Sequence, residues 1–215
     1  MFEDQSFHIV PSVRHLRFLD LALSSKEDWI LLTCAHIGNL KEIVKYCHSH
    51  RKKVIVNHEL VGGLGADKVS FQMLKKMYKV DAVMGSSAIR LSMMKKESLP
   101  TIRRISLIDS FALETTFYSI DHSPCDVIEL RPAYYAVQFL NRFKEAQPCE
   151  YVAAGFIEDI DMVREVKKAG FSASVERIKG IKNGGCGFRI SVSGSCEKAV
   201  EICRKNGIEP EKIYF

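Results

Sequence analysis

Residues 54–78 read VIVNHELVGGLGADKVSFQMLKKMY: a short apolar run, a glycine-rich loop, an acidic residue and an amphipathic stretch. That order predicts a buried β-strand, a turn, a helix cap at Asp67 and a helix. Similar apolar runs start near positions 8, 30, 81, 101, 126, 151 and 171, and a helix-like stretch follows each except the last. Alternating strands and helices indicate a parallel sheet, and eight such units predict an α/β fold, a closed (β/α)8 TIM-like barrel.

The eight units fit within residues 1–176, which we assign to one barrel domain with short loops. Residues 177–215 are then a C-terminal extension, predicted as a short β-α-β unit from the turn at Asn183-Gly184, the alternating run 187–192 and the helical pattern 197–205. Cys186 lies between glycines in this extension. It is either an accessible, reactive thiol or an incidental cysteine in a glycine-rich hairpin.

Composition limits the class of protein without naming a partner. The net charge of +5 suits an anionic ligand or a nucleic acid but also many soluble enzymes. Seven cysteines without a C-x-x-C pair, and no secretory signal pattern at the start, favour reduced thiols in the cytoplasm. No apolar run approaches 18 residues, which argues against a membrane partner. A homo-oligomer stays open.

Polar side chains follow the third and fourth predicted strands. His58 and Glu59 precede three glycines, whose backbone could approach a ligand closely or could simply allow a tight turn. Ser86 and Ser87 come after the fourth strand, where hydroxyls and a helix N-terminus suit an anion, although serine is also an ordinary helix cap. His58 and Glu59 have no spaced third ligand, so no metal site is predicted, and no cofactor motif occurs.

The fifth and sixth strands carry charges. Of the adjacent Arg103 and Arg104, only one can point into the barrel. Glu129 and Arg131 lie two residues apart on one face of the next strand, so Glu129 could pair with the inward arginine. An ion pair and a ligand clamp look the same in sequence. Lysines at 75, 76, 79, 95 and 96 are expected on solvated helix ends, or on an RNA-facing surface if they cluster.

Taken in order, these residues resemble the glycerol-3-phosphate-responsive antiterminator family, the glycerol uptake operon regulators. The similarity covers residues 7–176, and the stretch with the most specific match is 104–113 (RISLIDSFAL). The other matching elements are 10–14 (VPSVR), 38–43 (GNLKEI), 54–64 (VIVNHELVGGL), 126–132 (DVIELRP) and 153–157 (AAGFI). Phe156 stands where the family has a second glycine, and residues 172–174 (SAS) only partly match a Ser-Thr-Ser element.

The resemblance implies a barrel that binds glycerol 3-phosphate and, once liganded, promotes transcription antitermination by acting on leader mRNA. It implies no catalysis. We expect a small phosphorylated ligand at the strand ends and leader RNA as a candidate partner. The expected roles are ligand charge for Arg104 or Arg103, with Glu129 and Arg131 beside them, ligand hydroxyls for His58 and Glu59, polar donation for Ser86 and Ser87, and phosphate contacts for Gly155 and Ser174.

Two other classes of function fit parts of the sequence. A His-Glu pair, an inward arginine and a strand-end glutamate are also the layout of TIM-barrel lyases and isomerases, an analogy of fold alone. A sulphur-handling module would instead use Cys186, because the Gly-Cys-Gly turn is similar to that of small selenium/sulphur carrier-like domains. Unusual reactivity of Cys186 compared with the other six cysteines would favour this last class.

Overall fold

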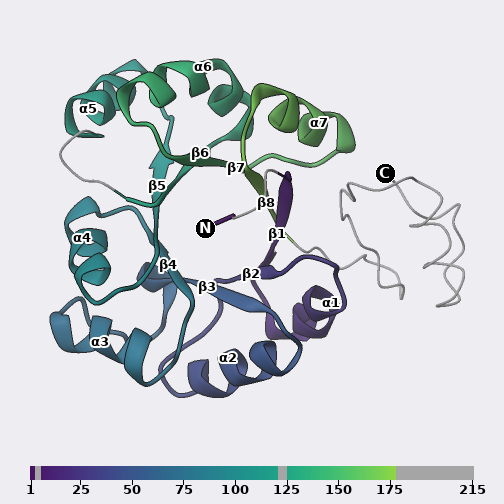
Figure 1. Ribbon diagram of the computed structural model, residues 1–215, viewed down its shortest axis with the longest axis vertical. Helices are drawn as coiled ribbons and strands as arrows, with labels where there is room; N and C mark the ends of the chain where they lie inside the picture. Colours follow the sequence, from purple (N-terminus) through teal and green to yellow (C-terminus); the bar gives the residue numbers. More distant parts are fainter. Residues whose placement is uncertain (3–5, 121–124, 178–215) are drawn as a thin grey trace, which may run out of the picture.

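The computed structural model describes residues 1–2, 6–120 and 125–177, and they form a closed barrel of eight parallel strands in sequence order. The strands are β1 His8–Val13, β2 Trp29–Leu32, β3 Lys53–Asn57, β4 Ala82–Gly85, β5 Thr101–Ser106, β6 Val127–Arg131, β7 Glu150–Ala154 and β8 Ala173–Arg177. β8 pairs with β1 and closes the ring, as Figure 1 shows in a view down the barrel. The predicted (β/α)8 fold is confirmed.

A helix follows each of the first seven strands and lies outside the ring (Figure 1). The helices are α1 Leu19–Leu23, α2 Leu40–Ser49, α3 Lys68–Lys76, α4 Ala88–Lys96, α5 Ser110–Ile120, α6 Ala133–Ala146 and α7 Ile160–Ala169. Two 3-10 turns, η1 Leu16–Phe18 and η2 His58–Leu60, precede α1 and α3. The first predicted helix is therefore split between η1 and α1. The predicted extension 177–215 and Cys186 lie outside the described residues, apart from Arg177 at the end of β8.

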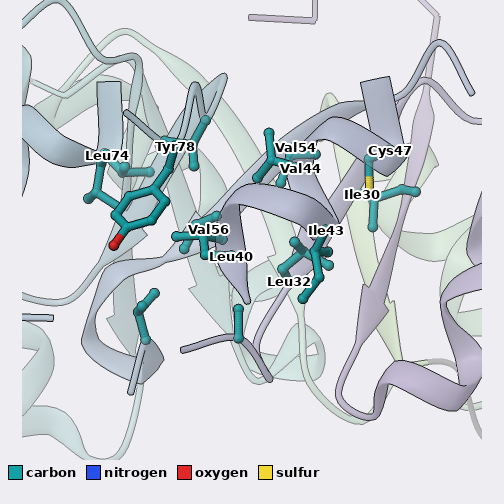
Figure 2. Packing of buried hydrophobic residues seen from close by; sticks show 14 of the residues in the cluster. Ile30, Leu32, Leu40, Ile43, Val44, Cys47, Val54, Val56, Leu74 and Tyr78 are labelled. Carbon is teal, nitrogen blue, oxygen red and sulfur yellow. The ribbon is translucent and has the colours of Figure 1, made fainter. Parts of the chain in front are cut away.

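The helices pack on the sheet through continuous apolar surfaces. Figure 2 shows one such cluster, in which the inner face of α2, Leu74 of α3 and Tyr78 just after α3 meet β2 and β3. The residues labelled there are Ile30, Leu32, Leu40, Ile43, Val44, Cys47, Val54, Val56, Leu74 and Tyr78. Alternate strand residues, such as Leu31 and Ile55, instead fill the barrel interior. Because both faces of each strand are covered, the strands are apolar on both sides.

The amino ends of the strands form the closed end of the barrel. Phe2 is buried there, stacked on His8 and edge-on to Trp29, and its N–H donates to Glu150. The opposite end, where the strands run into the βα loops, carries the polar residues of interest. We call it the mouth.

Carboxylates at the amino ends pin neighbouring strands together. Glu27 Oε2 accepts the Ile9 N–H at 3.2 Å, which joins the start of β2 to β1. Asp81 Oδ2 accepts the Val54 N–H at 2.7 Å and Asp126 Oδ2 accepts the Thr101 N–H at 2.8 Å, which do the same for β4 with β3 and for β6 with β5. Each pin joins two consecutive strands. No helix in the described ranges is long and apolar enough to cross a membrane.

Candidate functional site at the mouth of the barrel

The candidate site is the layer of inward-facing side chains nearest the mouth. Strand pairing places Asn57 beside Met84, and Arg104 beside Glu129. Met84 belongs to the apolar cluster that fills the barrel, and paired residues of a parallel sheet share a face, so this layer lies inside the ring. Polar groups from β3, β5 and β6 therefore converge above an apolar interior.

Arg104 and Glu129 form a buried ion pair. Arg104 Nε donates to Glu129 Oε1 at 2.8 Å, and Nη2 lies 2.9 Å from the Met84 sulfur. The Glu129 side chain is 1% exposed and that of Arg104 is 16% exposed, toward the mouth. The second carboxylate oxygen, Oε2, is buried and accepts no hydrogen bond within the described residues. The pair is thus formed, but it leaves one acceptor unused.

The neighbouring Arg103 points the other way, toward the helices. Its Nη2 donates to Ser119 Oγ at 3.3 Å, and burial lowers the pKa of its guanidinium. Of the two arginines, Arg104 is therefore the one that points into the barrel. Arg103 is a buried residue of the sheet–helix layer.

Asn57 is a further polar residue of the inner-wall layer, and no feature of the sequence marked it as a candidate. It is fully buried; its Oδ1 accepts the Glu59 N–H at 3.0 Å, whereas its Nδ2 has no partner among the described residues. Its inward position follows from strand alternation with Ile55, which the structure places in the barrel interior. An unused amide donor and an unused carboxylate acceptor in one buried layer are groups that a polyol can satisfy.

Glu59, Ser86 and Ser87 satisfy one another. Glu59 Oε1 accepts from Ser86 N at 2.8 Å, from Ser86 Oγ at 2.6 Å and from Ser87 N at 3.3 Å. Burial opposes ionisation of Glu59, but the hydrogen bonds from Ser86 outweigh it, so the pKa is held below its ordinary value. The carboxylate thus occupies the anion site at the start of α4. Ser86 and Ser87 therefore hold the loop after β4 against the loop after β3.

His58 lies outside the barrel interior. Its ring is edge-on to Phe71 of α3, a residue of the outer apolar cluster, and its Nε2 is buried without a partner in the described part of the chain. Burial lowers the pKa of the imidazole and keeps it neutral. A Cβ on Gly85 would lie 2.4 Å from His58 Nε2, so the ring fills the space that this glycine leaves. The structure thus places His58 against α3 and Gly85, on the other side of the sheet from the inner-wall layer.

The remaining candidates divide between the rim and the outer layer. Arg131 ends β6 on the same inward face as Glu129, and its side chain makes no hydrogen bond or ion pair within the described ranges. Gly155 follows β7 with a left-handed φ of 78°, and it lies against Arg131 and Pro132. Ser174 is buried beside Ala153 of the outer cluster, and its Oγ donates to Glu176 Oε1 at 3.2 Å. Arg131 and Gly155 adjoin the mouth, and Ser174 does not.

Two further chemistries find no support in the described residues. No group of three or more histidine, cysteine or acidic side chains there could hold a metal ion. Cys34, Cys47, Cys125 and Cys149 are free thiols, and burial raises the pKa of Cys47 and Cys149 to about 11, which disfavours their thiolates.

Comparison with solved structures identifies barrels of the same fold. The glycerol uptake operon antiterminator regulatory protein of Listeria monocytogenes superposes with a TM-score of 0.74 at 24% identity, over 78% of this chain and 90% of that one. A glycerol uptake operon antiterminator-related protein of Thermotoga maritima gives 0.71 at 24%, over 79% and 94%. The tryptophan synthase α-subunit of Pyrococcus furiosus gives 0.63 at 16%, over 82% and 88%.

These likenesses show the fold, which regulators and enzymes share. No curated protein matches the sequence. A family model, that of the glycerol-3-phosphate responsive antiterminator, matches residues 9–176, from β1 into β8. That match covers most of the chain and all of the mouth described above, and the chain therefore belongs to the glycerol-3-phosphate responsive antiterminator family.

Proposed function

We propose that the mouth of the barrel binds a small phosphorylated polyol, glycerol 3-phosphate or a close relative, and that this binding controls an interaction with leader RNA. The ligand proposal rests on two buried polar groups that have no hydrogen-bond partner in the described residues. Asn57 Nδ2 is a donor and Glu129 Oε2 an acceptor, both on the inner wall and both without partners in the described residues. Hydroxyls of a polyol satisfy one donor and one acceptor at once.

The charges of the mouth suit a phosphate at its rim. Arg104 is neutralised by Glu129, whereas Arg131 has no acidic partner in the described part of the chain. The backbone at Gly155 lies next to the Cβ of Arg131, so an anion there would meet a residue without a side chain, within reach of a guanidinium. The proposed orientation puts the ligand's hydroxyls at Asn57 and Glu129 and its phosphate at Arg131.

Calorimetric titration and thermal shift with glycerol 3-phosphate, glycerol and inorganic phosphate test this proposal. Glycerol 3-phosphate is expected to bind saturably and more tightly than either part alone. Arg131→Gln should weaken glycerol 3-phosphate at least tenfold and leave glycerol unchanged, while Arg164→Gln, an exposed control on α7, should change neither. Failure of all three ligands to bind the wild-type chain refutes the ligand assignment.

Support for an RNA surface comes from the other end of the barrel. All the helices run in one direction, so the basic residues of their last turns gather around the amino ends of the strands. Lys75 and Lys76 end α3, Lys95 and Lys96 end α4, and these two helices pack side by side. Cations there also stabilise the helix ends, so clustering alone does not require RNA. The proposed RNA surface and ligand mouth then lie on opposite faces.

Fluorescence anisotropy with a synthetic RNA stem-loop, measured over a salt series, tests the surface. Lys76→Gln with Lys96→Gln should weaken binding and reduce the slope of log affinity against log salt. Lys167→Gln with Lys168→Gln removes the same charge from the last turn of α7 and is the matched control. Equal losses from both double variants would show attraction by overall charge and would refute a surface at α3 and α4.

A further inference from the structure

A pocket of about 600 Å³ lies at the amino ends of the strands, on the face opposite the mouth. It extends below the consecutive strands β2 to β6 and beside the end of α4. Trp29, Leu99 and Pro100 give it apolar surface. Its volume is within the range of sites that hold a small organic molecule. We call it the amino-end pocket.

The charged side chains of the amino-end pocket balance one another. Two lysines, Lys53 and Lys95, and two aspartates, Asp81 and Asp126, line it. Lys95 Nζ donates to Asp126 Oδ1 at 2.8 Å, so this pair is already satisfied. Because the side-chain charges cancel, the pocket itself offers little attraction to a free phosphate. Its chemistry suits a neutral ligand that carries both donors and acceptors.

Three polar groups of the pocket are available to such a ligand. Ser98 Oγ and Lys53 Nζ make no hydrogen bond or ion pair with any described residue, and Lys53 Nζ lies over the Trp29 ring, 5.2 Å from its centroid. His48 and Val54 both donate to Oδ2 of Asp81, which leaves Oδ1 without a donor in the described part of the chain. A hydroxyl, an ammonium and a carboxylate oxygen therefore adjoin apolar surface.

A nucleobase has this combination of properties, because it is planar and neutral, with apolar faces and a polar edge. The position of the pocket also favours a base, since Lys95 lines it and ends α4, where the proposed RNA surface lies. Proteins that read single-stranded RNA bind unstacked bases against aromatic side chains and hydrogen-bond their edges. Here the phosphates would meet the exposed lysines and the base the balanced pocket.

We propose that the amino-end pocket binds one unpaired nucleobase of an RNA whose phosphates lie along the last turns of α3 and α4. This inference rests on the proposed RNA surface and adds the place where that surface would sense a base. Lysines at the helix ends attract any RNA through its charge. The pocket is then the part of the surface that distinguishes an RNA with an accessible base.

Fluorescence of Trp29 tests the pocket directly, because Trp29 is the only tryptophan of the chain. The full chain is titrated with short single-stranded RNAs of each base type and with an abasic RNA of the same length and charge. At least one base-bearing RNA should change the fluorescence saturably and bind at least tenfold more tightly than the abasic RNA. The ratio of these two affinities separates recognition of the base from attraction of the phosphates.

Two variants with matched controls locate the binding. Ser98→Leu narrows the pocket without changing its charge, and it should reduce the affinity ratio at least tenfold. Ser49→Leu makes the same change at the end of α2, outside the pocket, and should leave the ratio unchanged. If Ser98→Leu does not fold, as judged by circular dichroism, Lys53→Gln replaces it. Lys79→Gln, an exposed lysine between α3 and β4 outside the pocket, is then the control.

The outcomes separate the pocket from the RNA surface. Equal affinities for base-bearing and abasic RNA overturn the proposal, and so does an unchanged ratio in the pocket variant. If an RNA stem-loop binds through Lys76 and Lys96 without any change in Trp29 fluorescence, the pocket is refuted and the RNA surface stands. If no RNA binds the wild-type chain, both are refuted.

Discussion

Removing Arg104 while Glu129 stays in place should destabilise the barrel strongly. At 2.8 Å and an effective dielectric of about 20, the attraction between the two charges is roughly 6 kcal/mol, part of which offsets the desolvation of both groups. Glu129 is almost wholly buried, so Arg104→Met leaves an unpaired carboxylate in an apolar barrel. We expect a loss of about 3 kcal/mol in the free energy of unfolding at pH 7. The melting temperature should then fall by about 6–12 °C.

Denaturant unfolding of three variants and the wild type isolates this effect. Arg104→Met combined with Glu129→Gln should recover all but about 1 kcal/mol, because the stranded charge is gone. Arg164→Met breaks an exposed pair of nearly equal length, 2.9 Å to Asp161, and should cost at most about 0.5 kcal/mol. A loss below 1 kcal/mol, or no recovery in the double variant, would refute the assigned pairing.

Three further substitutions probe other contacts of the same barrel. Glu59→Ala should lower the free energy of unfolding by about 1 kcal/mol in denaturant titration at pH 7. Folding lowers the pKa of Glu59, so this loss should be present above the unfolded pKa of about 4.3 and should vanish as the pH falls through the folded pKa. Gly85→Ala should lower the free energy of unfolding by about 1–3 kcal/mol, and with it the melting temperature, because the new Cβ clashes with His58. Adding His58→Ala should partly restore the stability. An equal loss from Gly85→Ala with and without His58 would contradict that contact. Lys52→Met removes an ammonium that donates to two backbone carbonyls at 2.6 and 2.7 Å and should cost about 2 kcal/mol by denaturant titration, and a neutral result would show that water replaces those bonds.

The barrel follows directly from the sequence, whereas the site follows only in part. Repeated short apolar runs and capped helices allow few arrangements other than a parallel barrel. Spacing also placed Glu129 and Arg131 on one face, and the structure confirms that Glu129 pairs with the inward arginine. Glu129 could be predicted as the partner because residues side by side on adjacent strands point to the same face of the sheet.

The positions of several other expected residues could not be read from the sequence, for physical reasons. In parallel strands both faces are buried, so the pattern of apolar residues does not reveal which face looks inward. That is why Ser174 was expected at the mouth although it lies among the outer residues. Glu59 meets Ser86 across two loops, a distance that no local pattern encodes. Asn57 was overlooked because an amide at a strand end resembles an ordinary turn residue.

The carboxylate pins at the closed end bear on the order in which the barrel assembles. Each pin spans only 18, 27 or 25 residues, whereas the β1–β8 pairing joins the two ends of the described chain. Contacts that are close in sequence carry a smaller loop-closure cost and form sooner. Pairs of consecutive strands should therefore form first and ring closure last. In pulsed hydrogen exchange during refolding, the amides of Ile9, Val54 and Thr101 should gain protection before the β8 amides that pair with β1, and the reverse order would exclude assembly by strand pairs.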